Sequence, residues 1–255
     1  MDPKNTRVSI TINGPLHLGH LFLCKVNFHE AKRSGGKFFV HHDNLQPYWL
    51  QRIGSRAAGD KQIAENNRCL GWAGIKIAGA RADSEIDQKV VHDLLRKVGL
   101  HRREKLTGDE EHDYLRAKLQ DVGDPGAGWY PYCPLLTAAK VIQDATDGVT
   151  HVIRGREILT EFSLYAHLFR VYTDDRSPPP LQVFLPRLMD GIGHELSDVS
   201  KTRGRWKVRD LMQSMRPDVV DQLLRRSCLT DPDGGWTVDN VRQKPVLRER
   251  ALQPA

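Results

Sequence analysis

The feature that most constrains the fold is a strand, a turn and a helix near the start of the chain, followed by a second strand. Residues 7–12 read RVSITI, an alternating β-branched run, and Asn-Gly-Pro at 13–15 breaks it before an apolar-periodic stretch over 18–32. After Ser-Gly-Gly at 34–36, the run KFFVHHD at 37–43 indicates a second, buried strand. This order predicts a βαβ unit and therefore a parallel sheet.

The rest of the chain continues this α/β pattern. Its 255 residues suffice for one large α/β domain or for one domain with a smaller appendage, and the pattern favours the second. Within residues 138–155, AAKVIQDATDGVTHVIRG predicts two short strands joined by a turn at Asp147-Gly148, and the polar tail from Arg242 onward is predicted to fray. Periodicity also predicts a strand near 182–185 and helices over 57–70, 84–98, 157–172, 208–215 and 217–226.

Composition narrows the class of protein. The chain is 39% hydrophobic and 27% charged, and no apolar run approaches the roughly eighteen residues of a membrane span, so we expect a soluble, cytoplasmic protein without membrane contact. The formal charge of +6 favours encounters with polyanions such as tRNA or nucleotides, although an arginine-rich composition alone gives the same balance. Free thiols and no zinc site are expected, because four widely spaced cysteines form neither a CxxC pair nor a disulfide framework: Cys24, Cys69, Cys133 and Cys228.

A pair of histidines marks the start of the first predicted helix. The stretch PLHLGHL places His17 and His20 on one side of the first helical turn, with Gly19 between them. A base or ribose could approach the glycine backbone, while both imidazoles and the helix amino terminus direct positive or donor groups to one spot. This arrangement suits a nucleotide phosphate, although an isolated pattern of this kind is often a helix start with incidental histidines.

A second candidate segment is the loop DVSKTRG at 198–204. Ser200, Lys201 and Thr202 stand there close to a glycine, and a mobile lysine could meet a triphosphate as charge builds on it. Taken alone, the segment is only a basic loop. The two segments together, in this order and about 180 residues apart, are far more specific.

With both segments the sequence resembles the class I aminoacyl-tRNA synthetases of the glutamyl and glutaminyl branch, in particular the stand-alone catalytic core of glutamyl-queuosine tRNA(Asp) synthetases. His17-Leu18-Gly19-His20 matches the HIGH motif, and VSKT at 199–202 matches the KMSKS loop. GVTHVIRG at 148–155 is close to a segment that follows the acidic turn of glutamyl enzymes, and GGKFFVHHDN at 35–44 stands where that branch has GGKFILRIED. The resemblance covers most of residues 5–230.

The resemblance implies an α/β fold with a Rossmann-like parallel sheet. Its first half, which binds ATP and the amino acid, would be residues 1–83, and its second half, with the KMSKS-like loop, 134–204. Between them, 84–133 would be a connective insertion for the tRNA acceptor end, cut to about half, and 205–255 a small helical appendage with a tail. Beyond Trp236 there is no place for an anticodon-binding domain, and the cysteine cluster that holds zinc in the glutamyl-queuosine enzymes is missing, so a complete tRNA-reading synthetase is not expected.

The resemblance also implies roles for individual residues. The implied catalytic residues are His17, His20 and Lys201, and the implied ATP-binding residues are His17, Gly19, His20, Glu157, Ser200 and Lys201, with Mg²⁺ held mainly by the ATP phosphates rather than by a protein metal site. The implied amino-acid-binding residues are Arg7, Ser9, Asp43, Leu136, Lys140 and Arg154. Two arginines for carboxylates and Asp43 for the α-amino group would suit glutamate or a close analogue, although each residue alone could equally be an ordinary ion pair or strand cap.

Four positions depart from the family pattern. Leu136 replaces a tyrosine and Lys140 a small polar residue, which puts side-chain recognition in doubt. Arg156 replaces an acidic residue, so Glu157 becomes the nearest candidate for the ATP ribose, and Asp198 replaces the first lysine of the loop.

These features leave three hypotheses open. The first is activation of glutamate or an analogue as an aminoacyl-adenylate, with transfer to tRNA or a tRNA-like nucleoside hydroxyl. The second is an adenylate-forming amide ligase that acts on an amine other than tRNA. The third is a non-catalytic regulatory protein that keeps the fold. The oligomeric state is open in all three.

Overall fold

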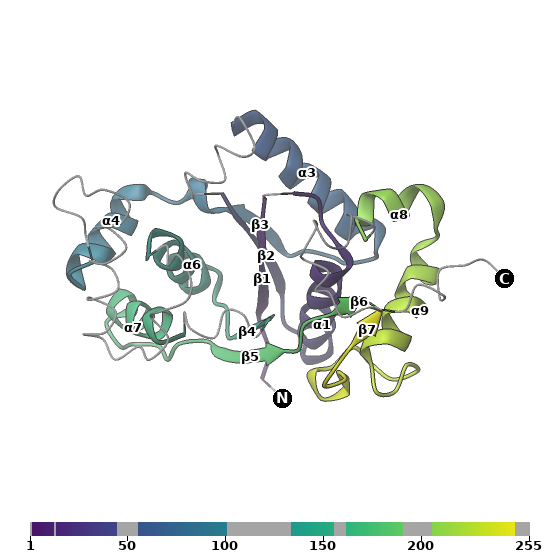
Figure 1. The fold of residues 1–255 in the computed structure, drawn as a ribbon. Coiled ribbons are helices and arrows are strands. Elements are labelled where there is room, and N and C mark those ends of the chain that lie inside the picture. The colour runs from purple at the N-terminus through teal and green to yellow at the C-terminus, as the bar shows by residue number, and fades with distance from the viewer. Residues whose placement is uncertain are drawn as a thin grey trace.

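A five-stranded sheet forms the centre of the molecule (Figure 1). The computed structural model describes residues 2–12, 14–44, 56–100, 134–155, 162–190 and 206–247. All neighbouring strands pair in parallel, in the order β3-β2-β1-β4-β5, which confirms the predicted βαβ unit and the α/β class. The strands are β1 (Thr6–Thr11), β2 (Phe38–Asp43), β3 (Gly79–Ala82), β4 (His151–Gly155) and β5 (Leu181–Leu185).

Helices cover both faces of this sheet (Figure 1). On one side lie α1 (Leu18–Ser34), α3 (Arg56–Trp72), α8 (Val208–Ser214) and α9 (Pro217–Cys228). On the other side lie α4 (Gln88–Lys97), α6 (Pro134–Asp147) and α7 (Phe162–Thr173). Two 3-10 turns, Asp83–Glu85 and Val238–Asn240, complete the described helical segments, and the first of them replaces the start of the helix predicted from residue 84.

The two faces of the sheet are chemically different. Val8 and Ile10 of β1 pack into the core beneath α1, together with Val40 of β2. The alternate residues of these strands, among them Arg7 and His41, project to the face covered by α6. Because this second face is also buried, its polar side chains need partners inside the protein.

Two predictions about the second half of the chain are wrong. Residues up to Asp147 continue α6, so only one strand, β4, follows the turn at Gly148. A short apolar run fits either a strand or a buried helix, and the helix forms because Ala138, Ala139 and Ile142 pack in one cluster with residues of α4 and α7. The predicted frayed tail is ordered as far as β7 (Val246–Leu247), which pairs in parallel with β6 (Met189–Asp190) and buries Leu247.

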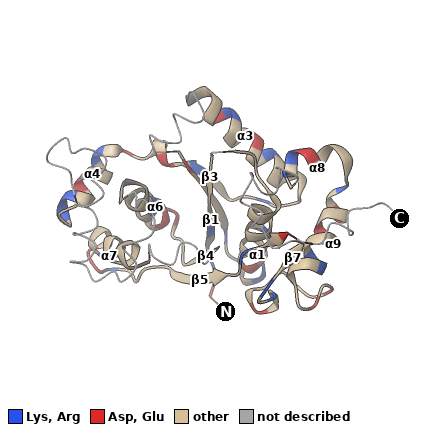
Figure 2. Ribbon diagram, in the orientation of Figure 1, with Lys and Arg blue, Asp and Glu red and all other residues tan. Residues whose placement is uncertain are grey.

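Charges of both signs occur on the outer helices α3, α4 and α8 (Figure 2). These three helices therefore do not form a uniformly basic surface that would account for the formal charge of +6. Within the described residues, no helix is both long and apolar enough to cross a membrane. Cys24, Cys69 and Cys228 are buried free thiols, and Cys133 lies outside the described residues.

The strand order creates a switch point between β1 and β4. The connection from β1 to β2 runs through α1 on one face, whereas the connection from β4 to β5 runs through α7 on the other. Open parallel sheets bind ligands outside the carboxyl ends of their strands at such a point. Residues after β1, at the end of β2 and near the end of β4 therefore meet where a ligand site is expected.

Candidate active site

The amino terminus of α1 is built around His17. This residue caps the helix in an extended conformation, and its Nδ1 accepts a hydrogen bond from the Gly19 backbone N–H at 3.1 Å. With Nδ1 as acceptor, a neutral His17 carries its proton on Nε2, which can donate to a ligand. No acidic residue stands in the first turn of α1, so the positive end of the helix dipole is not offset there.

The second histidine stacks against the first. The ring centroids of His17 and His20 lie 3.8 Å apart, with the planes tilted by 30°. Burial lowers the pKa of His17 well below its usual value, and His20 lowers it further. Burial also lowers the pKa of His20 to about 4, although the nearby Asp43 acts in the opposite direction. Both rings are therefore neutral at neutral pH, and they offer N–H donors rather than positive charges.

The segment after the predicted lysine loop lies beside these histidines. Leu18 N–H donates to the Trp206 carbonyl at 3.0 Å, and Val208 N–H donates to the Leu16 carbonyl at 2.8 Å. His17 and Lys207 form the antiparallel bridge between these two bonds. Ser200 and Lys201 belong to residues 191–205, outside the described residues, and so does Glu157 in 156–161.

All six residues predicted to bind the amino acid are described. Arg7 and Ser9 stand on β1, Asp43 at the end of β2 and Arg154 on β4. Leu136 and Lys140 stand four residues apart on α6. The structure buries most of this set between the sheet and the layer of α6 and α7, with exposed fractions of 2% for Arg7, 6% for Asp43, 8% for Leu136, 4% for Lys140 and 5% for Arg154.

Arg7 has a resident carboxylate as its partner. Its Nε donates to Asp144 Oδ1 at 2.9 Å, and its Nη2 donates to Asp144 Oδ2 at 2.9 Å, while Nη1 donates to Ser9 Oγ at 2.7 Å. Tyr165 OH donates to Asp144 Oδ2 at 2.6 Å. Burial raises the pKa of Asp144, but Arg7 and His41 outweigh it, so the net pKa is lowered and the carboxylate stays ionised. Asp144 was not among the residues predicted from the sequence, because its place one turn after Lys140 depends on α6, which forms where strands were predicted.

Asp43 also has a neighbour of opposite charge. Lys140 Nζ lies 3.6 Å from Asp43 Oδ2, and Thr11 Oγ1 donates to the same oxygen at 3.4 Å. Asp83, directly after β3, is fully buried. Its pKa is raised well above the usual range, mainly by burial and secondly by the negative charge of Asp43. Within the described part of the chain, Asp43 Oδ1 and both carboxyl oxygens of Asp83 have no hydrogen-bond partner. A neutral, protonated Asp83 is consistent with this environment.

Further polar side chains around α6 also have partners. His41 lies between two carboxylates, with Nδ1 3.6 Å from Asp144 Oδ1 and Nε2 3.1 Å from Asp147 Oδ2. Asp147 also pairs with Arg81 of β3 at 3.0 Å. Most of the charged side chains described on the face of the sheet below α6 thus have a partner of opposite charge within the protein.

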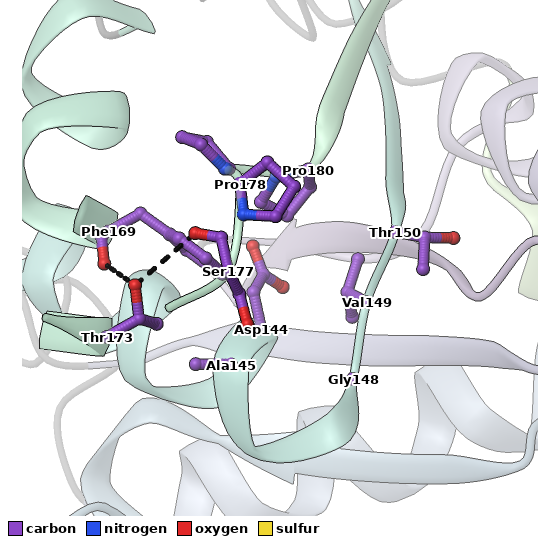
Figure 3. A pocket seen from close by; sticks show the side chains of 11 residues that line it. Asp144, Ala145, Gly148, Val149, Thr150, Phe169, Thr173, Ser177, Pro178 and Pro180 are labelled. Carbon is purple, nitrogen blue, oxygen red and sulfur yellow. Dashed lines mark hydrogen bonds between the residues drawn. The ribbon is translucent and has the colours of Figure 1, made fainter. Parts of the chain in front are cut away.

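A separate cavity of about 330 Å³ lies at the opposite end of the sheet (Figure 3). Gly148 and Thr150, which precede β4, and Pro178–Pro180, which precede β5, line it, and Figure 3 shows Asp144 reaching it from α6. None of the predicted site residues lines this cavity. Among the described residues, no group of three or more His, Cys, Asp or Glu side chains could hold a metal ion.

Curated relatives of this chain are glutamate–tRNA ligases, whereas no protein-family model matches it. Glutamate–tRNA ligase 2 of Granulibacter bethesdensis is 34% identical over 82 residues, which cover 32% of this chain and 18% of the relative. Glutamate–tRNA ligase 1 of Paracoccus denitrificans is 25% identical over 277 aligned positions, which cover 89% of this chain and 62% of the relative. The chain therefore spans less than two thirds of the length of these relatives.

Solved structures share the fold at low sequence identity. A glutamate tRNA ligase from Elizabethkingia meningosepticum, in complex with its amino acid, superposes with a TM-score of 0.68 at 14% identity, covering 98% of this chain and 68% of that one. The glutamate-tRNA synthetase of Elizabethkingia anophelis gives 0.66 at 15% identity, with 98% and 69% covered. A tyrosyl-tRNA synthetase from Archaeoglobus fulgidus, complexed with L-tyrosine, gives 0.56 at 16%, with 81% and 61% covered. The Rossmann-like fold predicted from the sequence is confirmed.

Proposed function

We propose that this chain, which is related in sequence to the glutamate–tRNA ligases and shares their fold, uses ATP to activate a carboxylic acid as an acyl-adenylate. One juxtaposition carries the proposal. An uncompensated helix amino terminus with two neutral imidazoles stands at the switch point of the sheet, and the charge of Asp43 acts on both His20 and the buried Arg7. The influence of Asp43 on the pKa of His20 links the two halves of this site.

In the proposed reaction, a carboxylate oxygen of the acid attacks the α-phosphorus of ATP. The new oxygen–phosphorus bond forms as the bond from the α-phosphorus to the bridging oxygen breaks, and pyrophosphate leaves. His17 Nε2–H, His20 and the amino terminus of α1 would donate to the phosphate oxygens, where negative charge builds in the transition state. Mg²⁺, when bound with ATP, would neutralise part of the phosphate charge.

The proposed nucleotide site also includes Gly19, Ser200, Lys201 and Glu157. Lys201 precedes Trp206 by five residues in the sequence, and Trp206 is paired with Leu18, next to His17. The proposed division of the chain is the one implied by the sequence: 1–83 and 134–204 for the sheet domain, 84–133 for a shortened insertion and 205–255 for the appendage.

The proposed acid is glutamate or a close analogue, held by Arg7, Ser9 and Arg154 with Leu136 and Lys140 beside it. The acceptor that we propose is tRNA or a tRNA-like nucleoside hydroxyl. This part of the proposal is supported by the names of the relatives, which are ligases that join glutamate to tRNA.

Pyrophosphate exchange into ATP, driven by a panel of acids, tests the activation step. We expect exchange with at least one acid, and Lys201→Ala should lower its rate by about 100-fold or more. Lys97→Ala, which removes an exposed lysine at the end of α4, is the matched control and should leave the rate unchanged. Lack of exchange with every acid, under conditions in which ATP binds, would leave the non-catalytic hypothesis.

The acceptor needs a separate measurement. Incubation with ATP, the labelled acid and bulk tRNA should give label that precipitates with the tRNA and is released by mild base, as expected for an ester. Activation without labelled tRNA would favour the amide-forming alternative.

A further inference from the structure

The charges expected to recognise an amino acid already have partners within the protein. Asp144 neutralises Arg7 through a bidentate contact, and Lys140 lies 3.6 Å from the carboxylate of Asp43. Both partners come from α6, where positions four residues apart lie on the same side of the helix. The resemblance implies a small polar residue at this position, where the present chain has Lys140.

The charge balance next to Asp43 disfavours an incoming ammonium group. Lys140 compensates the charge of Asp43, and the neighbouring Asp83 adds no further charge in the neutral form that its burial favours. Two like charges in contact at a poorly solvated site repel each other more strongly than they do in water. Asp43 Oδ1, which has no hydrogen-bond partner among the described residues, could still accept a hydrogen bond from an α-ammonium, but the charge of that carboxylate is already compensated through Oδ2, and Lys140 would repel the second cation.

The same geometry favours a hydrogen-bond acceptor. The side chain of Lys140 is buried to 4% exposure, and its ammonium has only donors to offer. A carboxylate, hydroxyl or carbonyl oxygen of a ligand would gain such a donor without facing a like charge.

We infer that the acid activated at this site carries no ammonium group on its α-carbon, and that Lys140 determines this specificity. The substrate class is a small dicarboxylic acid with hydrogen, hydroxyl or a keto oxygen at that carbon. Lys140 Nζ donates to this end of the acid. This inference rests on the proposed function, because it describes the acid-binding half of the same site.

Pyrophosphate exchange with four probe acids tests the inference. Glutamate, glutarate, 2-hydroxyglutarate and 2-oxoglutarate are compared at equal concentration with the full chain. We expect at least one of the three acids without an ammonium to support exchange about tenfold faster than glutamate. Lys140→Asn should reverse this preference, because Asp43 then becomes free to pair with an ammonium. Faster exchange with glutamate in the unaltered protein, or a preference that Lys140→Asn leaves unchanged, would overturn the inference and leave the proposed function intact.

Calorimetric binding of the same acids separates the two proposals if no acid supports exchange. A lack of exchange with every acid would remove the proposed function. Tighter binding of an acid without an ammonium than of glutamate, reversed in Lys140→Asn, would still support the specificity, and equal or absent binding of all four would overturn it. Lys97→Asn controls for the lost charge, and thermal melting checks folding. Lys140→Gln, which keeps the length of the side chain, takes the place of Lys140→Asn if the latter does not fold.

Discussion

His17 combines a structural and a chemical role in one ring. Nδ1 caps α1 through the Gly19 N–H, and Nε2 is the nitrogen that we propose donates to a phosphate. Burial keeps this ring and the ring of His20 neutral, so both act through directed N–H groups, whose strength depends on orientation. At the residue scale, then, the two nitrogens of one histidine can be tested separately.

Two substitutions of His17 should divide these roles. In His17→Asn the amide oxygen can replace Nδ1, so the cap and the stability should be kept while pyrophosphate exchange falls by about 100-fold. In His17→Gln the amide nitrogen can replace Nε2, so more activity should remain although the cap is lost, at about 1 kcal/mol of unfolding free energy. Urea unfolding and exchange rates, measured on both variants, check this. Equal activity in the two variants would contradict the assigned roles.

Asp144 should be among the residues most costly to replace. Asp144→Asn removes the charge that compensates a fully buried Arg7, and loss of one partner of a buried pair costs about 3–5 kcal/mol. The matched control is Asp218→Asn, because Asp218 pairs with Arg216 in a similar bidentate contact while both side chains are more than half exposed. The control should cost less than about 1 kcal/mol in urea unfolding. Similar costs for the two variants would show that burial does not determine the strength of the Arg7 pair.

At the scale of elements, α6 organises the proposed acid-binding half of the site. Its positions 140, 144 and 147 follow at helical spacing and direct one cation and two carboxylates toward the sheet. The helix ends where Val149 N–H donates to the Asp144 carbonyl at 2.9 Å, with Gly148 in the left-handed region at φ 62°. The start of β4, and with it Arg154, depends on this helix end.

Gly148→Ala should therefore destabilise the protein by about 1 kcal/mol, because alanine adopts a positive φ only with strain. Gly71→Ala is the matched control: Gly71 lies within α3, and an added Cβ would meet no heavy atom within 4 Å. This control should raise the unfolding free energy by about 0.5–1 kcal/mol. Thermal or urea unfolding of both variants measures the difference, and a neutral Gly148→Ala would contradict the assigned helix end.

At the scale of the whole molecule, several histidines are held neutral by burial. Burial is the largest cause of the lowered pKa of His17, His20, His29 and His42. At pH values between these lowered pKa values and the ordinary histidine pKa near 6.5, the unfolded chain binds more protons than the native one. The free energy of unfolding therefore falls as the pH falls. Toward pH 4 and below, carboxylates with a lowered native pKa, such as Asp144, add to the loss.

We expect the free energy of unfolding to be lower at pH 5 than at pH 7 by about 1–3 kcal/mol. Urea titrations at the two pH values and constant ionic strength provide the measurement. His20→Gln removes one titrating ring and should make the difference smaller. A free energy of unfolding that does not change between pH 7 and pH 5 would show that these histidines are not neutral in the native state.

Much of the fold and part of the site could be predicted from residues alone. The βαβ opening and both histidines at the start of α1 follow from local periodicity, whereas the six proposed acid-binding residues came only from the family resemblance. The segment before β4 could not be predicted in this way. AAKVI fits a strand or a helix equally well, and packing against α4 and α7 makes it a helix.

The sequence by itself determined where chemistry-bearing side chains stand along each element, because helix and strand periods are local properties. Only the tertiary structure decided the charges that they present. Asp144 faces Arg7 across 137 positions of the chain, and Lys140 faces Asp43 across the space between α6 and β2. Burial, which depends on the whole fold, keeps the histidines neutral. Pairing and desolvation are non-local, so the residues that suggested a site for a zwitterion include Arg7 and Asp43, whose charges already have partners within the protein.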